Sequence, residues 1–444
     1  MARSKLYLSL AAIAAMAFLF SGHKTLQSAG TGTTINVMQV GAKGDGKTND
    51  TSAFDAALRK AAEKGGTVVV PKGEYVIDTE EPLYVRSNVS IVGKSNPVIR
   101  FKTLSRNGSF GYEGFDVRGS NISISGLTVN GGNRLIRGFG IHPGSKNITL
   151  SHNVIENMTQ SSDPDSHAYR ATITGVLIYG GTSDIKLEGN VIRGIKAFNK
   201  SPVARGVMVY AQDDLPYAQR VSILNNRISD ISPRDDADGV YFDMPDDPNK
   251  LSNSVVKGNT ISNVAKRGIK IAAPGVTVSD NRVTNSFLNN NEYLFPGEDA
   301  IPQDMFSGIS IYANNVTVHG NVIDGIGSYY AGIEADLGDL KNIVIYNNKI
   351  TNGSNAIIKN TNGIRLGTIE NFKVHDNKLS NMQTGIFSPI TDTQAGSIKK
   401  NNISKVDFGI RFSLYDRFGY KDSNVIVADN LITARKMKIE ALPK

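Results

Sequence analysis

The sequence contains no cysteine and no tryptophan. Without cysteine the chain has no disulfide framework, no thiolate zinc site and no thiol nucleophile, so its fold must rest on a hydrophobic core. Without tryptophan, any stacking of aromatic side chains on sugar rings falls to tyrosine, of which there are 16.

Long apolar runs are also lacking, apart from Leu6–Phe20 near the amino terminus. That run follows Arg3 and Lys5, is too short for a comfortable membrane span, and is typical of a secretory leader. We expect cleavage after Ala29 and a secreted, extracellular protein, or one anchored in the cell envelope if the leader stays. No later segment predicts a membrane span.

Charge of one sign does not accumulate in any long run. The chain has 49 Lys and Arg against 41 Asp and Glu, a formal charge of +8, and loss of Arg3, Lys5 and Lys24 with the leader would leave about +5. This balance suits an acidic partner, and ordinary solubility charge explains it equally well. Without a basic cluster, nucleic acid is not an expected partner.

Two interleaved motifs recur along most of the chain. The first is N-x-[IVL] after a short β-rich run, as in ITLSHNVI and IVIYNNKI. The second is Gly followed by alternating apolar residues, as in TGVLIY and RGVMVY. The recurring asparagines are Asn153, Asn190, Asn226, Asn259, Asn281, Asn321, Asn348, Asn377, Asn401 and Asn430. The recurring glycines are Gly175, Gly206, Gly239, Gly268, Gly308, Gly332, Gly363, Gly385 and Gly409, with Gly140 and Gly114 as upstream extensions.

Two short strands per turn, stacked without intervening helices, predict a parallel β-helix in which stacked coils share one core. We expect inward ladders from Val176 to Ile410 and from Ile178 to Leu366. The asparagines are expected at corners, bonded to backbone and to the next asparagine. The glycines are interpreted as corner residues with positive φ.

The stretch VGAKGDGKT fits the phosphate-binding pattern G-x-x-x-x-G-K-[ST] between Gly41 and Thr48. No strand–helix units follow it, and Asn49-Asp50-Thr51 reads as the start of the helix, which leaves Lys47 outside. We therefore expect no nucleotide site. The helix TSAFDAALRKAAEK, with Phe54 and Leu58 on one face, is expected to plug the open end of the β-helix.

The segment from Ile35 to Ile77, with GAKGDGKTND followed by GGTVVVPKGEY, resembles the amino-terminal signature of the pectate-lyase-like superfamily. That superfamily includes polygalacturonases, alginate epimerases and lyases, and phage tailspike depolymerases. The resemblance implies an all-β, right-handed parallel β-helix of about 10–12 coils with an amino-terminal capping helix, acting on a polysaccharide. It does not identify the reaction, because many chemistries share this fold.

The motifs of particular subfamilies are weak or absent. Polygalacturonases carry N-T-D-G, an Asp pair, G-H-G and R-I-K, whereas this chain has Ala237-Asp238-Gly239, then KRGIKI, and no G-H-G. Alginate epimerases carry a D-P-H-E-like stretch, of which Asp163–His167 is only a loose echo.

Strand alternation predicts a site on the outer face of the glycine-led strands, beneath the long loops SSDPDSHAYRAT, DDLPYAQ, DMPDDPNKL and NSFLNNNEYLFPGEDAIPQDMF. The candidate catalytic residues are Lys270, Arg267, Tyr241, Asp238 and Asp243. The candidate substrate-binding residues are Arg205, Tyr210, Tyr312, Glu334, Asp336, Arg365 and His167. His142 and His167 are the histidines best placed for catalysis. A solvated, salt-bridged ladder is the alternative interpretation of any single one of these residues.

Two mechanisms compete. In β-elimination from a uronate, Arg267 and Lys270 would neutralise the carboxylate, and Tyr210, Tyr241 or Tyr312 would serve as the base. In hydrolysis, Asp238 with Asp243 or Glu334 with Asp336 would flank the bond. C5 epimerisation and a non-catalytic, carbohydrate-binding β-helix remain alternatives.

The acid-rich run DDADGVYFDMPDD leaves Ca²⁺ open as a cofactor, although it lacks the spacing of a calcium loop. No metal ligands are assigned, and the expected partner is an acidic polysaccharide bound by a monomer. The expected organisation is a leader at 1–29, a cap with the helix and first strands at 30–100, the β-helix at 101–435 and a tail at 436–444.

Overall fold

The computed structural model describes residues 32–102, 110–197, 203–232, 237–284, 307–324, 331–351, 361–414 and 423–442. The expected leader and the loop 285–306 lie outside these residues. Gly32–Lys444 form one compact unit. Within the described residues, no helix is long and apolar enough to cross a membrane.

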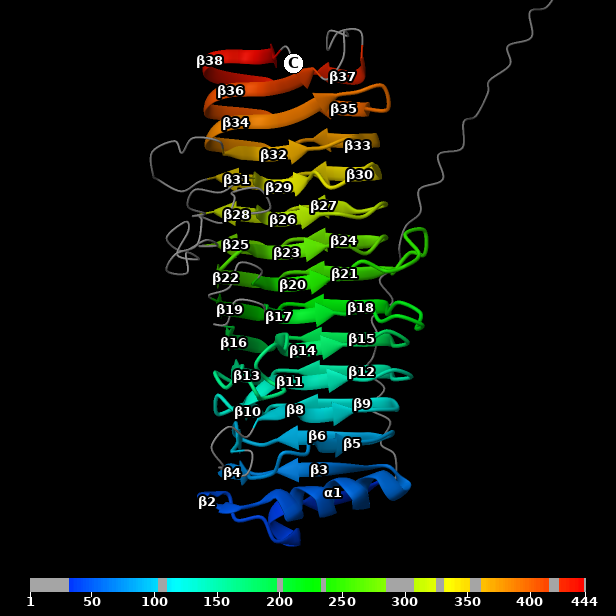
Figure 1. Cartoon of the computed structure of the whole chain (residues 1–444), viewed down its shortest axis with the longest axis vertical. Coiled ribbons are helices and arrows are strands. Elements are labelled where there is room, and N and C mark those ends of the chain that lie inside the picture. Colours follow the sequence, from blue (N-terminus) through cyan, green and yellow to red (C-terminus); the bar gives the residue numbers. More distant parts are fainter. Residues whose placement is uncertain are drawn as a thin grey trace, which may run out of the picture. The chain divides into compact units, whose positions relative to one another are not determined.

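The unit Gly32–Lys444 is built of stacked coils whose strands pair in parallel with those of the next coil (Figure 1). Each complete coil contributes three strands, where the sequence motifs predicted two. The motif N-x-[IVL] spans a strand boundary, because the ladder asparagine lies between two strands and the residue after it begins the second of them. The predicted all-β parallel β-helix is confirmed.

The strands form three rows. The first row is a 14-stranded sheet of β1 (Thr33–Asn36), β3 (Gly66–Val70), β6 (Val89–Gly93), β9 (Ser120–Ser125), β12 (Lys146–Ser151), β15 (Ser183–Glu188), β18 (Gln219–Leu224), β21 (Ser254–Lys257), β24 (Val276–Ser279), β27 (Thr317–His319), β30 (Leu340–Tyr346), β33 (Ile369–His375), β35 (Ala395–Lys399) and β37 (Asn424–Ala428). The second row is β2 (Asp45–Asn49), β4 (Glu74–Ile77), β7 (Val98–Phe101), β10 (Thr128–Asn130), β13 (Val154–Thr159), β16 (Val191–Lys196), β19 (Arg227–Ser232), β22 (Thr260–Val264), β25 (Arg282–Thr284), β28 (Val322–Asp324) and β31 (Lys349–Thr351). The third row is β5 (Leu83–Val85), β8 (Gly111–Val117), β11 (Leu135–Ile141), β14 (Ile173–Ile178), β17 (Ala204–Val209), β20 (Asp238–Phe242), β23 (Arg267–Ile271), β26 (Ser307–Ile311), β29 (Ala331–Ala335) and β32 (Asn362–Leu366). Near the carboxyl end the second and third rows merge in β34 (Lys378–Ile390), β36 (Asn402–Leu414) and β38 (Leu431–Leu442). Thus β38 includes most of the segment expected as a tail.

The core consists of inward-facing residues stacked in register through successive coils. Val176 pairs with Val207, which pairs with Val240, and the row continues to Ile410 as the motif predicted. These side chains are essentially inaccessible to solvent. Since no coil has enough apolar area to fold alone, the stack as a whole supplies the stability.

The asparagine ladder is confirmed. From Asn153 to Asn401, each amide nitrogen donates to the side-chain oxygen of the next ladder asparagine, as Asn259 does to Asn281 at 2.9 Å, and to a backbone carbonyl, as Asn259 does to Ile223 at 2.9 Å. The residue before each ladder asparagine has positive φ. These residues are His152, Gly189, Asn225, Gly258, Asp280, Gly320, Asn347, Asp376, Lys400 and Asp429. The chain turns there in the left-handed region, which Gly, Asn and Asp tolerate best.

The recurring glycines were misinterpreted as positive-φ corners. None of the nine has positive φ, and all lie in or at the start of strands. A Cβ on Gly206 would approach the carbonyl oxygen of Gly239 to 2.5 Å and Ile228 to 2.6 Å. Glycine is needed there because the backbone of one coil packs directly on the next coil and on the second-row isoleucine.

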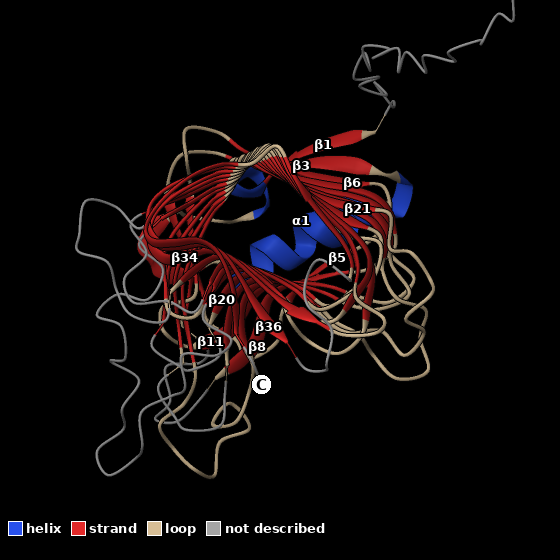
Figure 2. Cartoon of the chain, turned by 90° about the horizontal axis from the view of Figure 1, so that it is seen from above, coloured by secondary structure: helices blue, strands red, loops and turns tan. Residues whose placement is uncertain are grey.

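Helix α1 (Thr51–Lys64) has the predicted bounds and buries Phe54, Ala57, Leu58 and Ala61. It follows the 3₁₀ helix η1 (Val37–Val40) and contacts β1 and β3. In the view along the stack, α1 crosses the interior enclosed by the strand rows (Figure 2). The predicted role as an end plug is therefore confirmed.

The phosphate-binding pattern at Gly41–Thr48 does not form an anion cradle. The backbone amides of Lys43 and Gly44 donate to the Asp50 carboxylate at 2.6 and 3.2 Å. Those of Lys47 and Thr48 donate to Asp45, and these bonds lower the Asp45 pKa to about 2. Because carboxylates of the chain already occupy these amides, phosphate is excluded.

Candidate active site

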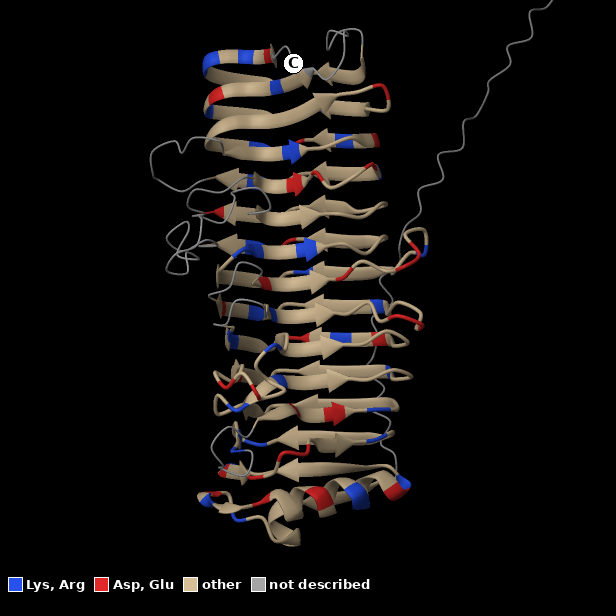
Figure 3. Cartoon of the chain, in the orientation of Figure 1, with Lys and Arg blue, Asp and Glu red and all other residues tan. Residues whose placement is uncertain are grey.

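The outward row of the third-row strands lies as alternation predicted. Leu177, Met208, Tyr241, Lys270, Ser310, Glu334 and Arg365 pair successively in register from β14 to β32. Acidic and basic residues are interspersed along the strands (Figure 3). Leu177, Met208 and Tyr241 pack with Ala272 and Tyr312 as a small apolar cluster outside the main core.

Arg205, Asp238 and Arg267 precede their glycines and are almost completely buried. Asp238 lies between the two arginines, 3.3 Å from Arg205 Nε and 3.4 Å from Arg267 Nη1. A carboxylate flanked by two guanidinium groups and shielded from solvent has no direct path to a polymer. The geometry suits positioning of the tyrosines above it, since the Arg205 guanidinium lies 4.8 Å from the Tyr241 ring centre.

Tyr241, Asp243 and Lys270 are brought together. Tyr241 donates its hydroxyl to Asp243 at 2.5 Å, and the Lys270 ammonium lies 4.3 Å from the Tyr241 ring centre and 5.8 Å from that of Tyr312. Burial, followed by the hydrogen bond to Asp243, raises the Tyr241 pKa far above its ordinary range. A tyrosine held protonated in this way is a poor base.

Glu334 is buried and accepts hydrogen bonds from Ser307, Ser310 and Tyr312 at 3.0–3.1 Å. Burial raises the Glu334 pKa, although Arg267 acts in the opposite direction. Asp336 is not in this group: it bonds Arg365 at 2.5 Å instead. Glu334 and Asp336 therefore take part in separate interactions and do not form a pair that could flank one glycosidic bond.

Tyr210 and His167 are the most accessible of the predicted binding residues. Tyr210 is 36% exposed and meets Tyr179 edge to face, with ring centres 6.1 Å apart. His167 is exposed on its loop and stacks on Tyr112 of β8 at 4.3 Å. Both lie near a second polar group at the amino-terminal end of the outward face.

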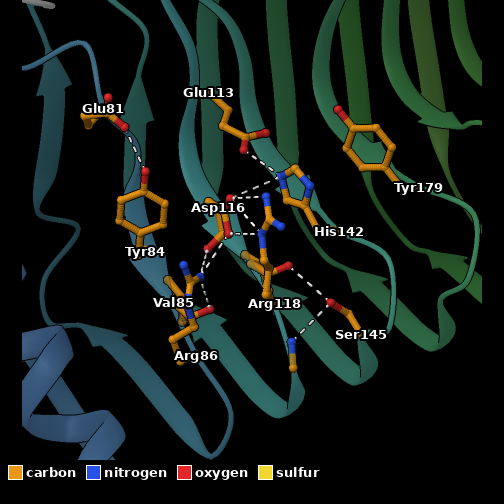
Figure 4. Close-up of polar contacts among 12 residues, drawn as sticks. Glu81, Tyr84, Val85, Arg86, Glu113, Asp116, Arg118, His142, Ser145 and Tyr179 are labelled. Atoms are coloured by element: carbon orange, nitrogen blue, oxygen red, sulfur yellow. Dashed lines mark hydrogen bonds and ion pairs between the residues drawn. The ribbon is translucent and has the colours of Figure 1, made fainter.

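This second group comprises Glu113, Asp116, Arg137, His142 and Tyr179. Glu113, Asp116, His142 and Tyr179 are labelled in Figure 4. Glu113 and Asp116 come from β8 and Arg137 from β11, while His142 and Tyr179 directly follow β11 and β14. His142 and Tyr179 continue the strand pairing, because Tyr179 N donates to Ile141 O at 3.0 Å. Successive coils thus place the five side chains side by side.

His142 is held by a carboxylate and a ring. Its Nε2 lies 2.7 Å from Glu113 Oε1 and 3.5 Å from Asp116 Oδ2. Its imidazole stacks on the Tyr179 ring at 4.7 Å with an interplanar angle of 20°. If Nε2 carries the proton donated to Glu113, the other ring nitrogen, Nδ1, is left with a lone pair.

Tyr179 accepts a hydrogen bond from Arg137 Nη1 at 2.5 Å. Burial raises the Tyr179 pKa, and the nearby Arg137 charge offsets part of that rise. The phenol is thus protonated at neutral pH. Because its oxygen accepts from Arg137, its own proton is left to donate elsewhere.

Together with Arg86 and Arg118, which bond Asp116, this group carries more positive than negative charge. Asp116 is bonded by Arg118 through both carboxylate oxygens and by Arg86 at 3.0 Å. With Arg137 3.8 Å from Glu113, three guanidinium groups face two carboxylates. Arg86 and Arg118 also keep 41% and 52% of their side-chain surface exposed. The group therefore favours an anionic ligand.

Glu113, Asp116 and His142 offer ligand atoms within 4.8 Å of one another, a spacing that a metal ion would accept. Their environment does not fit a cation. Asp116 is already neutralised by two arginines, and Glu113 is engaged by His142. A divalent ion would add charge to a group that already has a positive surplus.

Glu113, Asp116 and Arg137 were missed by sequence reasoning. The outward row was read from Gly175 onward, and its extension through Gly140 was out of phase by two residues. Phe139 pairs with Val176, so Gly138 is the counterpart of Gly175. Gly140 instead faces the site: a Cβ there would lie 1.8 Å from Glu113 Oε2. Counting from Gly114 and Gly138 gives Glu113, Asp116 and Arg137 as outward residues.

A family model described as rhamnogalacturonase A/epimerase, pectate lyase-like, matches residues 34–327. The chain belongs to this family. An exopolygalacturonase of Arabidopsis thaliana is 48% identical over 50 residues, which cover 11% of this chain and 11% of the relative. Alginate lyase 7 of Azotobacter vinelandii is 48% identical over 64 residues, 13% of this chain and 8% of the relative. The chain spans about a tenth of the length of these polysaccharide-acting relatives.

Solved structures of similar fold include the pneumococcal surface adhesin PfbA of Streptococcus pneumoniae. It has a TM-score of 0.56 at 15% identity, and the match covers 86% of this chain and 90% of that one. The tailspike of E. coli bacteriophage HK620, determined with a pentasaccharide, has a TM-score of 0.56 at 13% identity, covering 89% of this chain and 78% of its own. At these identities the likeness shows the fold alone.

Proposed function

We propose that this family member cleaves a uronate-containing polysaccharide by β-elimination at the group formed by Glu113, Arg137, His142 and Tyr179. The observation that carries the proposal is the stacking of His142 on Tyr179 at 4.7 Å beside guanidinium groups. A base, an acid and a positive charge are the three parts that elimination from a uronate needs.

The positive charge that elimination needs is supplied by Arg137. The proton at C5 of a uronate is α to a carboxylate, and its removal places negative charge on that carboxylate. Arg137 is only 13% exposed, and burial strengthens its interaction with a developing charge. Arg86 and Arg118, on the more open side, would hold the carboxylates of neighbouring sugars.

His142 would act as the base and Tyr179 as the acid. His142 Nδ1 takes the C5 proton, and the Glu113 carboxylate stabilises the imidazolium that forms. The C5–H electrons form the C4–C5 double bond, the C4–O bond breaks, and its electron pair leaves on the oxygen. Tyr179 donates its proton to that oxygen, and exchange with water then resets both side chains.

The relative placement of base and acid supports elimination over epimerisation. Two stacked rings present both groups to the same face of a sugar, as syn elimination requires. Epimerisation needs a proton delivered to the opposite face. Hydrolysis is disfavoured for the predicted carboxylate pairs, because Asp238 lies buried between two arginines and Glu334 is buried among hydroxyl groups.

The test is incubation with pectate, alginate, hyaluronan and a neutral glucan, following ultraviolet absorbance and reducing ends together. We expect both signals to rise on at least one acidic polymer, and His142→Gln and Tyr179→Phe to abolish both. Tyr346→Phe and His375→Gln, on first-row strands away from the site, are the matched controls and should keep full activity. Reducing ends without absorbance would mean hydrolysis, and inversion at C5 without new ends would mean epimerisation. Either result would overturn the proposal.

We further propose that the chain is exported by its apolar leader, Leu6–Phe20. An exported polysaccharide lyase meets its polymer without uptake. Expression with and without residues 1–29 tests this: the full chain should be found shortened outside the cytoplasm, and the truncated chain should stay inside. Recovery of uncleaved full chain in the cytoplasm would contradict export.

A further inference from the structure

A cavity of about 190 Å³ lies apart from the proposed active site, between the loops that follow β17 and β20. The sequence analysis placed the predicted site beneath both loops, yet the proposed elimination uses neither of them. The cavity is lined by Ala211, Gln212, Leu215, Pro216, Tyr217, Pro245, Asp246, Asp247 and Lys250.

The cavity walls are tied to the strands beneath them. Ala211 N donates to Asp243 at 3.4 Å, which joins one loop to the start of the other. The buried Tyr217 donates its hydroxyl to Val209 O at 3.2 Å, and Gly181 N donates to Pro216 O at 2.6 Å. The cavity is thus part of the fold and not a chance gap between loose loops.

The lining combines apolar and polar surfaces. Leu215, Pro216 and Pro245 provide flat or compact apolar surface, as the C–H face of a sugar ring requires. The Gln212 Oε1 atom is shielded from solvent and accepts no hydrogen bond from the described residues. A hydroxyl group of a ligand would satisfy it.

The cavity and the proposed active site differ in the sign of their charge. Asp246 and Asp247 outnumber Lys250, so the rim has a surplus negative charge where the Glu113 group has a surplus positive one. A uronate carboxylate would be repelled from the cavity, whereas the hydroxyls of a neutral sugar can bond carboxylates and the amide. We propose that this cavity binds a neutral sugar unit.

The position of the cavity indicates which polymer the enzyme acts on. This inference rests on the proposed function. β17 and β20 are the second and third strands after β11 in the third row. At roughly 4.8 Å per strand, the cavity lies about 10–15 Å along the stack from the strand that precedes His142. The enzyme would then act on a mixed polymer or a branched one, with a neutral residue near the uronate that is cleaved.

Binding can be tested without any turnover. Methyl glycosides of glucose, galactose, mannose and rhamnose would be titrated against the full chain by saturation-transfer NMR, with methyl galacturonide as a charged probe and CaCl₂ as a competitor that would displace a bound glycoside. We expect at least one neutral glycoside to bind, and Gln212→Ala to weaken it about tenfold. Leu215→Trp, which fills the cavity, should abolish binding.

Asp213→Ala, an exposed position in the same loop outside the lining, is the matched control and should bind as wild type. Thermal unfolding of each variant shows whether it is folded. The proposal is overturned if no neutral glycoside binds, if the uronide or Ca²⁺ binds in preference, or if both cavity variants bind like the control.

A second experiment distinguishes failure of this inference from failure of the proposed function. In the cavity variants, elimination on a polymer that mixes uronate with neutral sugars should slow, while elimination on a pure uronan is unchanged. If no uronan is cleaved at all but glycoside binding depends on Gln212 and Leu215, the proposed function fails and the binding site stands. If both polymers are cleaved equally by wild type and variants, the link to the substrate fails alone.

Discussion

At the residue scale, the proposed chemistry depends on a position that carries no functional group. Gly140 lies in the outward row between Asp116 and Leu177, and its missing side chain leaves the space that the Glu113 carboxylate occupies. Its φ is not in the left-handed region, so its backbone would accept any residue. Glycine is required there for the site rather than for the fold.

Gly140→Ala should therefore fold normally and lose activity. A Cβ 1.8 Å from Glu113 Oε2 and 2.9 Å from His142 Nε2 forces both side chains to move. A displacement of this size costs roughly 10²-fold in kcat/KM. Steady-state kinetics and thermal unfolding measure the two effects separately. An alanine variant with wild-type kcat/KM would contradict the assignment of Glu113 and His142 to the site.

Tyr179 gives a pH dependence. Burial raises its pKa above the ordinary value of 10.0, so the protonated acid persists as pH rises and is lost only above that value. We expect kcat/KM to show no alkaline decline up to about pH 10. Arg137→Gln removes the charge that opposes the rise and should shift the alkaline limb further upward while lowering kcat/KM. A decline of kcat/KM in wild type that begins near neutral pH would contradict this role.

Glu334 predicts a pH dependence of stability instead. Its pKa is raised in the folded chain, so the native state binds more protons than the unfolded state in the pH window above the ordinary glutamate pKa of 4.5. Stability is then lost as pH rises through the folded pKa. Glu334→Gln should melt at a higher temperature than wild type at pH 7, and the difference should vanish in acid. A variant that is less stable at pH 7 would show that the Arg267 interaction outweighs burial.

At the element scale, the asparagine ladder joins the corners of successive coils. Asn281→Ala removes the acceptor for both Asn259 N and its side-chain amide, and the donor to Val256 O. Each buried group left unsatisfied costs about 1–3 kcal/mol in the free energy of unfolding. The exposed Asn249→Ala is the control and should change it by less than about 0.5 kcal/mol. Urea unfolding distinguishes the two, and equal small losses would mean that the ladder is not stabilising.

Periodicity made much of this scale predictable. Helix α1 follows from the helical spacing of its apolar residues. The inward ladder from Val176 to Ile410 and the asparagine ladder follow from residues that recur once in each coil. The role of Gly206 could not be read this way, because what forbids a side chain is the carbonyl of Gly239 in the next coil. The site was missed for a related reason: Glu113 and His142 come from different coils, and only the register of β8 against β11 brings them together.

At the scale of the whole molecule, the surplus of positive charge predicts that binding of an acidic polymer depends on salt. The formal charge is +8 for the full chain, which the loss of Arg3, Lys5 and Lys24 with the leader would reduce by three, and Arg86 and Arg118 expose guanidinium groups. Attraction to a polyanion therefore weakens as salt screens it. Raising NaCl from about 0.05 M to about 0.5 M should increase KM several-fold and leave kcat nearly unchanged. Arg118→Gln should reduce this sensitivity. A KM indifferent to salt would remove the electrostatic part of the substrate assignment.

The residue with positive φ before each ladder asparagine allows the loops to change in evolution without changing the stacked strands. Each turn from the first row to the second is closed by the same short backbone conformation, whatever the length of the segment that follows between the second and third rows. Insertions and deletions in those segments leave the register of the stack untouched. A gene of this kind can exchange loops with distant relatives, or duplicate a coil, and acquire a new polymer specificity while keeping its skeleton.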